Sequence, residues 1–283
     1  MTFLQMKKIA KKAIKKPLLR IIGRGEPPAF RVENATGHGK CVIVCDHASN
    51  RVPKSLGDLG LGKADLKKHI AWDPGTEDIG RRLSKKLEAP VVFASYSRLV
   101  VDLNRGHNHA DCMRGVSDHI RIPGNEKLTA AHKAQRVAEI FRPYHSAVDA
   151  QVQRFLGRGI APLLLSIHSF TPKMDGFIRP WHIGVLWNKE EGIARRLIGS
   201  LKESNPKLRV GENEPYSLKS ENFTKNTVST HAEKRGLPYV IVEFRQDLVD
   251  TPAKAAKWAA IFYASLKPLM DDPSLYRLRR DRR

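Results

Sequence analysis

The chain has 283 residues, of which 41% are hydrophobic, and this length suits one large α/β domain or one domain with a small appendage. No apolar run reaches the roughly 18 residues that a membrane-spanning helix needs, so the sequence argues against such a span. The 3 cysteines form neither a disulfide framework nor a CxxC metal site, and they favour a reducing, cytoplasmic location.

The formal net charge of +21 is concentrated at the two ends of the chain. Residues 1–24 contain eight Lys or Arg and no acid, and residues 277–283 carry a net charge of +4, so 12 of the 21 charges lie in these tails. The remaining positive surplus is modest and suits a small anionic substrate. No nucleic-acid reader motif accompanies it, so no specific nucleic-acid binding is expected.

The N-terminal segment combines apolar residues at helical spacing with a lysine-rich face. We interpret residues 1–24 as a solvated basic arm; the alternative is a helix in weak contact with an anionic membrane surface. Residues 25–39 are rich in Pro and Gly and are predicted to be a linker. The expected organisation is an arm and linker over 1–39, one main domain over 40–270 and a basic tail over 271–283.

Hydrophobic patterns predict strands that alternate with helices along the chain. The expected strands are 41–45, 91–95, 98–103, 161–170, 182–187 and 239–245. The expected helices begin with one from Thr76, then cover 125–155 with a kink at Pro143, 189–203, 225–235 and 253–268. This alternation predicts a three-layer α/β/α fold around a mostly parallel central sheet.

Ionisable side chains follow four of the predicted strands at the point where each strand ends. They are Asp46 and His47; Asp102 and Arg105, with Asn104 between them; His168; and Glu243, Arg245 and Asp247. A charge beside a buried strand costs several kcal/mol unless it is paired or bound to metal. Ligands gather beyond the carboxyl ends of the strands in such sheets, so the four clusters predict one shared site.

His47 and His168 are the strongest candidates for metal ligands, and Asp73 is the preferred third ligand. Imidazole suits Zn²⁺, and a catalytic zinc site uses three protein ligands and leaves one position open. The alternative for each histidine is a hydrogen-bonded residue of the core. We expect one zinc ion per chain, with another divalent ion as the alternative.

The remaining candidates act on protons or on the substrate. Glu243 is the expected general base and acid, unless it forms only a structural salt bridge with Arg245. Arg105 offers a planar pair of donors for a carboxylate, Asn104 adds a donor beside it, and Arg245 is a further candidate for substrate binding. Arg98 is expected either to face a developing oxyanion or to be a solvated surface residue.

Six segments together resemble the N-formylglutamate amidohydrolase family. In chain order they are VIVCDHASNRVP, SRLVVDLNR, LLLSIHSFTP, NEPYS, THAEKRGLP and VIVEFRQDL, within residues 40–268. The resemblance implies an α/β fold with a mixed sheet, related to zinc carboxypeptidases and aspartoacylase. It assigns zinc to His47 and His168, catalysis to Glu243, the substrate carboxylate to Asn104 and Arg105, and the oxyanion to Arg98.

The implied activity is that of a zinc-dependent hydrolase of linear amide bonds. Its type substrate is N-formyl-L-glutamate, a small anionic N-acyl amino acid, which yields formate and glutamate in histidine degradation. The alternatives are a carboxypeptidase-like or cell-wall peptide amidase activity, and binding of anionic polymers or membranes through the tails. One position departs from the wider group, which has Glu three residues after the first histidine, where this chain has Asn50. The sequence therefore leaves the third ligand open, with Asp73 as the preferred residue.

Overall fold

The computed structural model describes residues 20–217 and 226–276. The strands in this part of the chain are β1 (Phe30–Glu33), β2 (Cys41–Cys45), β3 (Val91–Ala94), β4 (Val116–Ser117), β5 (Ile120–Arg121), β6 (Leu163–Phe170), β7 (Lys173–Met174), β8 (Phe177–Ile178), β9 (Ile183–Leu186), β10 (Val210–Glu212) and β11 (Tyr239–Arg245). The α-helices are α2 (Thr76–Leu87), α3 (Pro123–Glu126), α4 (Ala130–Arg136), α5 (Arg142–Leu156), α6 (Glu191–Ser204), α7 (Thr227–His231) and α8 (Pro252–Met270).

Seven strands form the central sheet, in the order β1-β3-β2-β6-β11-β9-β10. The four inner strands β3, β2, β6 and β11 are parallel to one another. At one edge β1 runs antiparallel to β3, and at the other β9 runs antiparallel to β11 while β10 runs parallel to β9. The predicted three-layer α/β fold with a mixed, mostly parallel sheet is confirmed.

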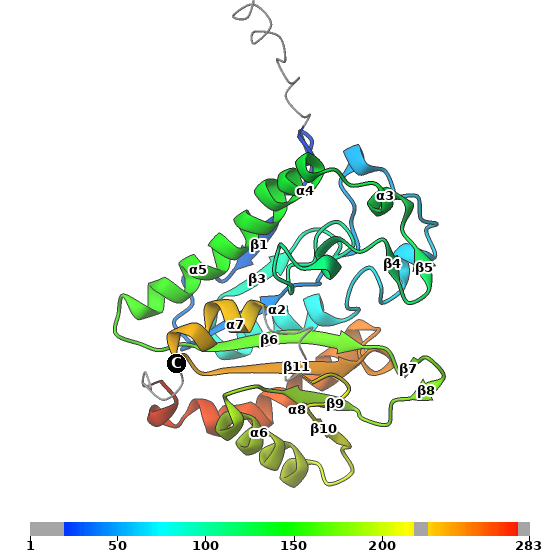
Figure 1. Cartoon of the computed structure of the whole chain (residues 1–283). Coiled ribbons are helices and arrows are strands. Elements are labelled where there is room, and N and C mark those ends of the chain that lie inside the picture. The colour runs from blue at the N-terminus through cyan, green and yellow to red at the C-terminus, as the bar shows by residue number, and fades with distance from the viewer. Residues whose placement is uncertain (1–19, 218–225, 277–283) are drawn as a thin grey trace, which may run out of the picture.

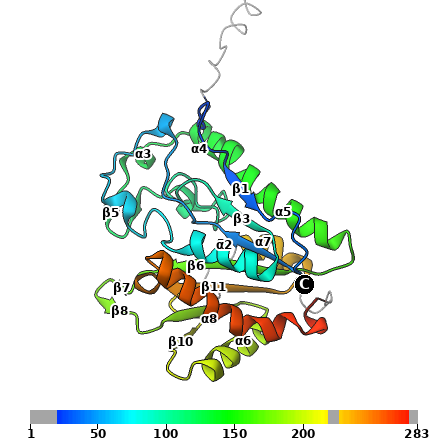
Figure 2. The ribbon, with the colours of Figure 1, turned by 180° about the vertical axis from the view of Figure 1, so that it is seen from behind.

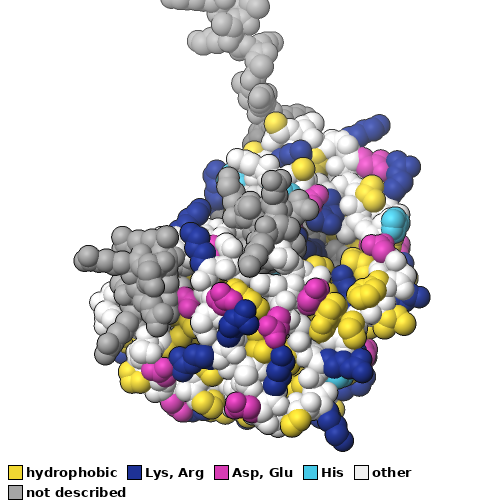
Figure 3. Space-filling model, turned by 60° about the horizontal axis from the view of Figure 1, so that its bottom comes forward, with side chains coloured by type: hydrophobic (Ala, Val, Ile, Leu, Met, Phe, Trp, Pro, Cys, Tyr) yellow, Lys and Arg dark blue, Asp and Glu magenta, His cyan; other side chains and the backbone are white. Residues whose placement is uncertain are grey.

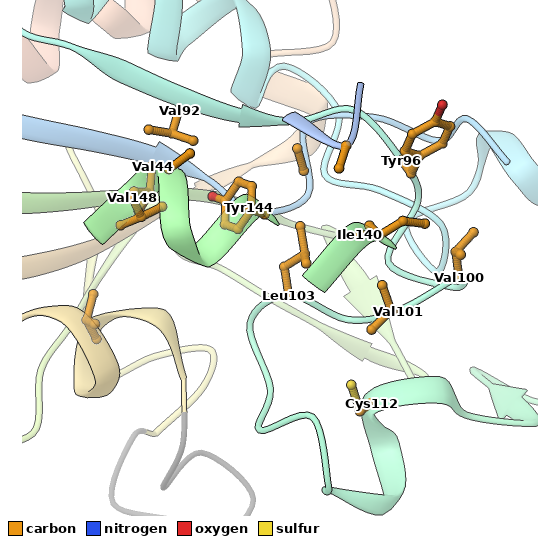
Figure 4. Close-up of a cluster of buried hydrophobic side chains, with 14 of the residues drawn as sticks. Val44, Val92, Tyr96, Val100, Val101, Leu103, Cys112, Ile140, Tyr144 and Val148 are labelled. Carbon is orange, nitrogen blue, oxygen red and sulfur yellow. The ribbon is translucent and has the colours of Figure 1, made fainter. Parts of the chain in front are cut away.

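Side chains that alternate along the strands build a separate hydrophobic core on each face of the sheet. In β2, Val42 and Val44 join the core beneath α5, whereas Ile43 joins the core beneath α2, α6 and α8. Figure 4 shows Val44 beside Tyr144 and Val148 of α5. Figure 1 shows α5 and α7 on the first face, and Figure 2 shows α2 and α8 in front of the other. Full burial on both faces explains why these strands are continuous apolar runs.

Two expectations about local structure are wrong. The segment expected to be a linker contributes an edge strand, because residues 30–33 pair with residues 91–94. Residues 98–103 are buried but form turns, not a strand. Their backbone groups bond to other loops, as when Arg98 N donates to Ala71 O and Asp102 N donates to Cys112 O. A short apolar run can therefore fill a core without joining a sheet ladder.

The long helix expected over 125–155 is divided near Pro143, as predicted. A π-helical turn over Val137–Phe141 joins α4 to α5, and Pro143 lies in the first turn of α5. Proline has no N–H to continue the α-helical ladder, and the wider π turn absorbs that interruption.

The two basic tails lie largely outside the described residues, so the expectations for residues 1–19 and 277–283 are not addressed by the structure. No helix in the described ranges is both long and apolar enough to cross a bilayer. On the face in Figure 3, Lys and Arg side chains are interspersed with acidic ones and form no single basic patch.

Candidate active site

A pocket of about 150 Å³ opens beyond the carboxyl ends of β2, β6 and β11. It is lined by His47, His69, Ile70, Asp73, Arg98, Asn104, Arg105, Arg114, Ser117, His168, Ser169, Met174, Tyr216 and Glu243. All the candidate site residues named from the sequence line this pocket except Arg245. Three of the four predicted strand-end clusters, together with the buried loop over 98–105, therefore meet at one place.

Strand alternation directs His168 and Glu243 to the same side of the sheet. The two residues are direct neighbours in the parallel register of β6 and β11. Leu164 precedes His168 by four residues and Ile241 precedes Glu243 by two, and both belong to the core beneath α5. The His168 imidazole and the Glu243 carboxylate therefore lie on the α5 side of the sheet, past the last core residues of their strands, where the pocket begins.

His47, Asp73 and His168 converge inside the pocket. Asp73 Oδ2 lies 3.2 Å from His47 Nδ1 and 2.9 Å from His168 Nδ1, and the ring centroids are 5.0 Å apart. Asp73 is placed by the turn before α2, where Gly75 has a φ of +82°. A Cβ on Gly75 would lie 2.4 Å from the carbonyl oxygen of Val249, so glycine permits this close approach.

The outer nitrogens of both imidazoles have partners of their own. His47 Nε2 lies 2.8 Å from Asp102 Oδ1. His168 Nε2 lies 3.1 Å from Ser166 Oγ and 3.5 Å from Asp46 Oδ2, and Tyr144 donates a 2.6 Å hydrogen bond to the other oxygen of Asp46. Such contacts fix the orientation of both rings, so that the Nδ1 atoms face the common centre.

The charges in this cluster are strongly coupled. Burial opposes protonation of His168, but hydrogen bonds with Asp46 and Asp73 outweigh burial and raise its pKa to about 10. Burial also opposes ionisation of Asp73, yet the neighbouring His47 and the bonds from both imidazoles lower the pKa of that carboxyl. A protonated imidazole and a buried carboxylate thus lie side by side, and a metal cation at the same place can take over the charge of that proton.

Glu243 has the opposite electrostatic character. Burial raises the pKa of its carboxyl to about 7, although the nearby His168 works in the other direction. Its Oε2 atom is buried and has no hydrogen-bond partner among the described residues. A carboxyl with a pKa near neutrality and an oxygen available in a pocket has the properties of a general base and acid.

Three further candidates lie along one wall. Arg98 is not a solvated surface residue, since its guanidinium bonds Asp102 Oδ2 at 3.0 Å and Asp73 Oδ1 at 3.4 Å. Asn104 accepts a 3.1 Å hydrogen bond from Thr227 N, which fixes its side chain beside His168. Arg105, the last residue of the buried loop over 98–105, donates a hydrogen bond from its guanidinium to Asn104 O at 3.0 Å. These contacts hold amide and guanidinium donors at the pocket wall.

The buried Arg136, which has no carboxylate partner among the described residues, hydrogen-bonds to the backbone of the loop that forms this wall. Arg136 donates to Val100 O, Gly124 O and Asn125 Oδ1 at 2.9, 3.3 and 2.6 Å. Asn125 in turn donates to Leu99 O and to Arg114 O. The network therefore ties the loop that carries the pocket arginines to α4.

We expect Arg136→Met to destabilise the fold by about 2–5 kcal/mol, because it leaves two buried acceptors, Val100 O and Asn125 Oδ1, without their donor. Urea denaturation should show a lower midpoint with an unchanged m value. Arg142→Met is the matched control, since Arg142 is exposed at the start of α5 and should lose little. Equal losses in both variants would contradict this role for the network.

Several sequence candidates lie elsewhere. Arg245 pairs with Asp247 at 2.8 Å and does not line the pocket, and no Glu243–Arg245 salt bridge occurs among the described contacts. Asn50 donates to Leu66 O and takes no part in the convergent cluster. Two other histidines, His145 and His231, bond to each other at 2.9 Å, and His145 also bonds to Leu103 O, so they pack against the buried loop and do not line the pocket.

The convergent cluster suits a zinc ion. One donor atom from each of His47, Asp73 and His168 lies within 4.8 Å of the others. Ligand atoms around tetrahedral Zn²⁺, with bonds of about 2.0–2.1 Å, are about 3.3 Å apart, which is close to the observed 3.2 and 2.9 Å. Two imidazoles and a carboxylate form a donor set typical of catalytic zinc, so the residues fit the ion.

The structure also identifies pocket residues that sequence patterns missed. Tyr216 lies in the NEPYS segment, and His69 and Arg114 lie in loops without any strand-end signal. Ser166 was hidden within an apolar strand pattern. Only Tyr216 had a signal in the sequence, namely the resemblance of its segment.

Known proteins resemble this chain in sequence and in fold. Residues 39–249 match the sequence profile of the N-formylglutamate amidohydrolase family. A gene product from Agrobacterium tumefaciens shares 32% identity and a TM-score of 0.83, over 89% of this chain and 100% of that one. An N-formylglutamate amidohydrolase from Ralstonia eutropha shares the fold at 17% identity and a TM-score of 0.63, over 86% and 97% of the two chains. No curated protein sequence gives a significant match.

Proposed function

Because the chain belongs to the N-formylglutamate amidohydrolase family, we propose that it hydrolyses the N-acyl amide of an acidic amino acid, with N-formyl-L-glutamate as the type substrate. The products are then formate and glutamate. One observation carries the proposal. The donor atoms of His47, Asp73 and His168 converge beside Glu243, whose Oε2 atom is buried without a hydrogen-bond partner in the described structure.

Binding of the substrate is assigned to the wall that holds Asn104 and Arg105. A guanidinium and an amide together match the geometry of a carboxylate, and both groups line the pocket. Arg98, fixed by two carboxylates, is assigned to the oxygen of the scissile carbonyl as negative charge develops there. Because its partners already hold Arg98 in place, little reorganisation is needed when that charge appears.

Proton movement is assigned to Glu243. Its carboxylate takes a proton from the attacking water and passes it to the amide nitrogen as the C–N bond breaks, so water supplies OH to the acyl carbon and H to the amine. A zinc ion held by His47, Asp73 and His168 supplies Lewis-acid chemistry, since it lowers the pKa of water to about 7 and polarises a carbonyl. Asp102 and Ser166 keep the two imidazoles in the orientation this requires.

The acyl group is the least constrained part of the proposal. A carboxypeptidase-like or cell-wall peptide amidase activity needs the same metal site and the same general base. The small pocket favours a small acyl group, since its volume is about 150 Å³. The three cysteines are free and buried, which agrees with the proposed cytoplasmic location.

Substrate profiling tests the proposal. Purified, zinc-loaded protein should release formate from N-formyl-L-glutamate with a higher kcat/KM than it shows for N-acetyl-L-glutamate or L-alanyl-L-glutamate. Amine release can be followed for all three substrates with one reagent. Hydrolysis of the acetyl or peptide compound without hydrolysis of the formyl compound would instead support the amidase alternative.

A further inference from the structure

The pocket carries a second guanidinium that the proposed reaction does not yet use. Arg114 lines the pocket together with Arg105, at the end of the short 3-10 helix Ala110–Met113. Its side chain is 29% exposed, and Arg105 is likewise partly exposed. Arg98, by contrast, is held between two buried carboxylates, those of Asp73 and Asp102.

Two sets of bonds hold Arg114 in place relative to Arg105. Asp102 N donates to Cys112 O at 2.7 Å and joins the two halves of the loop just below the arginines. Asn125 donates to Arg114 O at 2.9 Å and connects this backbone to the buried Arg136. The backbones of Arg105 and Arg114 therefore belong to one loop, which these hydrogen bonds hold in place.

The guanidinium of Arg114 is weakly engaged by protein groups. Its described carboxylate contact is with Asp111, through a single nitrogen at 3.4 Å, and Asp111 is itself 44% exposed. An exposed contact of this length contributes little and exchanges readily for a better acceptor. Burial lowers the pKa of Arg105, Asp102 opposes this change, and the nearby charges of Arg98 and Arg114 act in the same direction as burial, so Arg114 lies close enough to Arg105 for the two charges to interact.

We propose that Arg114 binds the second, side-chain carboxylate of the substrate and so restricts the site to N-acyl dicarboxylic amino acids. This inference rests on the proposed function: Asn104 and Arg105 take one carboxylate, and Arg114 takes the other. Arg179 is a poorer candidate, because it is bonded to Thr171 O and Tyr216 and does not line the pocket. A charge-assisted bond that only the dicarboxylate can form discriminates against a neutral side chain of equal size.

The kinetic test compares N-formyl-L-glutamate with N-formyl-L-glutamine, which has the same shape and lacks the second charge. Arg114→Gln should lower kcat/KM for the glutamate compound by roughly 10- to 100-fold and change that for the glutamine compound by less than about threefold. Arg121→Gln is the matched control, since Arg121 is an exposed arginine that pairs with Glu126 and does not line the pocket. A parallel fall for both substrates, or an unchanged preference, would overturn the inference.

Binding of glutarate separates this inference from the proposed function. Calorimetry should show that glutarate binds more tightly than butyrate, and that Arg114→Gln weakens glutarate about tenfold or more while butyrate is unaffected. If the wild type hydrolyses neither formyl compound, the proposed function fails and glutarate binding alone decides the role of Arg114. Equal affinities of the wild type for glutarate and butyrate would overturn that role.

Discussion

Glu243→Gln should lower kcat for N-formyl-L-glutamate by about 100- to 10,000-fold, because the amide cannot take a proton from water or return one to the leaving nitrogen. The side chain keeps its size, so binding of glutarate should change little. Steady-state kinetics with zinc-loaded protein measure the first effect and calorimetry measures the second. Arg245→Gln is the control, since Arg245 lies nearby in the chain but outside the pocket, and it should retain near-normal kcat.

The same substitution should affect stability in a pH-dependent way in the metal-free protein. Burial raises the pKa of Glu243 from 4.5 to about 7, so the native state holds a proton that the unfolded state releases between these values. The stability this group contributes is therefore complete below pH 4.5 and is lost as the pH rises through 7. Relative to the wild type, Glu243→Gln should gain up to about 3 kcal/mol at pH 8 and little at pH 4.5.

Chemical denaturation at the two pH values measures this difference. A variant that is inactive yet more stable at pH 8 cannot owe its inactivity to unfolding. If Glu243→Gln retained a kcat within about threefold of the wild type, the assignment of Glu243 as general base would be wrong.

Removing either imidazole of the cluster should abolish stable metal binding. The wild type is expected to hold roughly one zinc per chain after dialysis, and His47→Ala and His168→Ala should each retain little, because two remaining ligands hold the ion poorly. Elemental analysis of the dialysed proteins gives the metal content directly. His69→Ala is the matched control, since His69 lines the same pocket but lies outside the convergent cluster.

A graded variant adds a second readout. Asp102→Asn leaves every ligand in place but weakens the support of His47 Nε2 and the ion pair with Arg98, so zinc affinity should fall by about 10- to 100-fold without being lost. Undiminished zinc in both alanine variants would rule out the cluster as a metal site. An effect of His69→Ala as large as theirs would show that the loss was not specific to the cluster.

Much of the central sheet could be read from local patterns. The runs at 41–45, 91–94, 163–170, 183–186 and 239–245 are recognisable as strands because burial on both faces of the sheet favours mainly apolar side chains. The pattern failed for 98–103, which is equally apolar but lies in turns beneath α4. The apolar composition of a segment predicts that its side chains are buried, but it does not predict which groups its backbone hydrogen-bonds to.

The candidate residues at strand ends were visible in the sequence for the same reason. Charged side chains next to apolar runs at His47, His168 and Glu243 stand out because burial penalises them unless something compensates. The sequence also contained Arg245 in the same pattern, two residues from Glu243. Only the tertiary structure separates these two residues, because Glu243 faces the pocket while Arg245 pairs with Asp247.

By itself the sequence determined the α/β architecture, the family and the short list of chemically capable residues, since each depends on local order along the chain. Only the tertiary structure decided which of them meet. Asp73 joins His168 across 95 positions, and His47 meets Asp102 across 55. Arg114 reaches the same pocket from a loop without any pattern of its own. Such pairings follow from strand order, register and loop anchoring, which depend on the packing of the whole domain and not on any one segment.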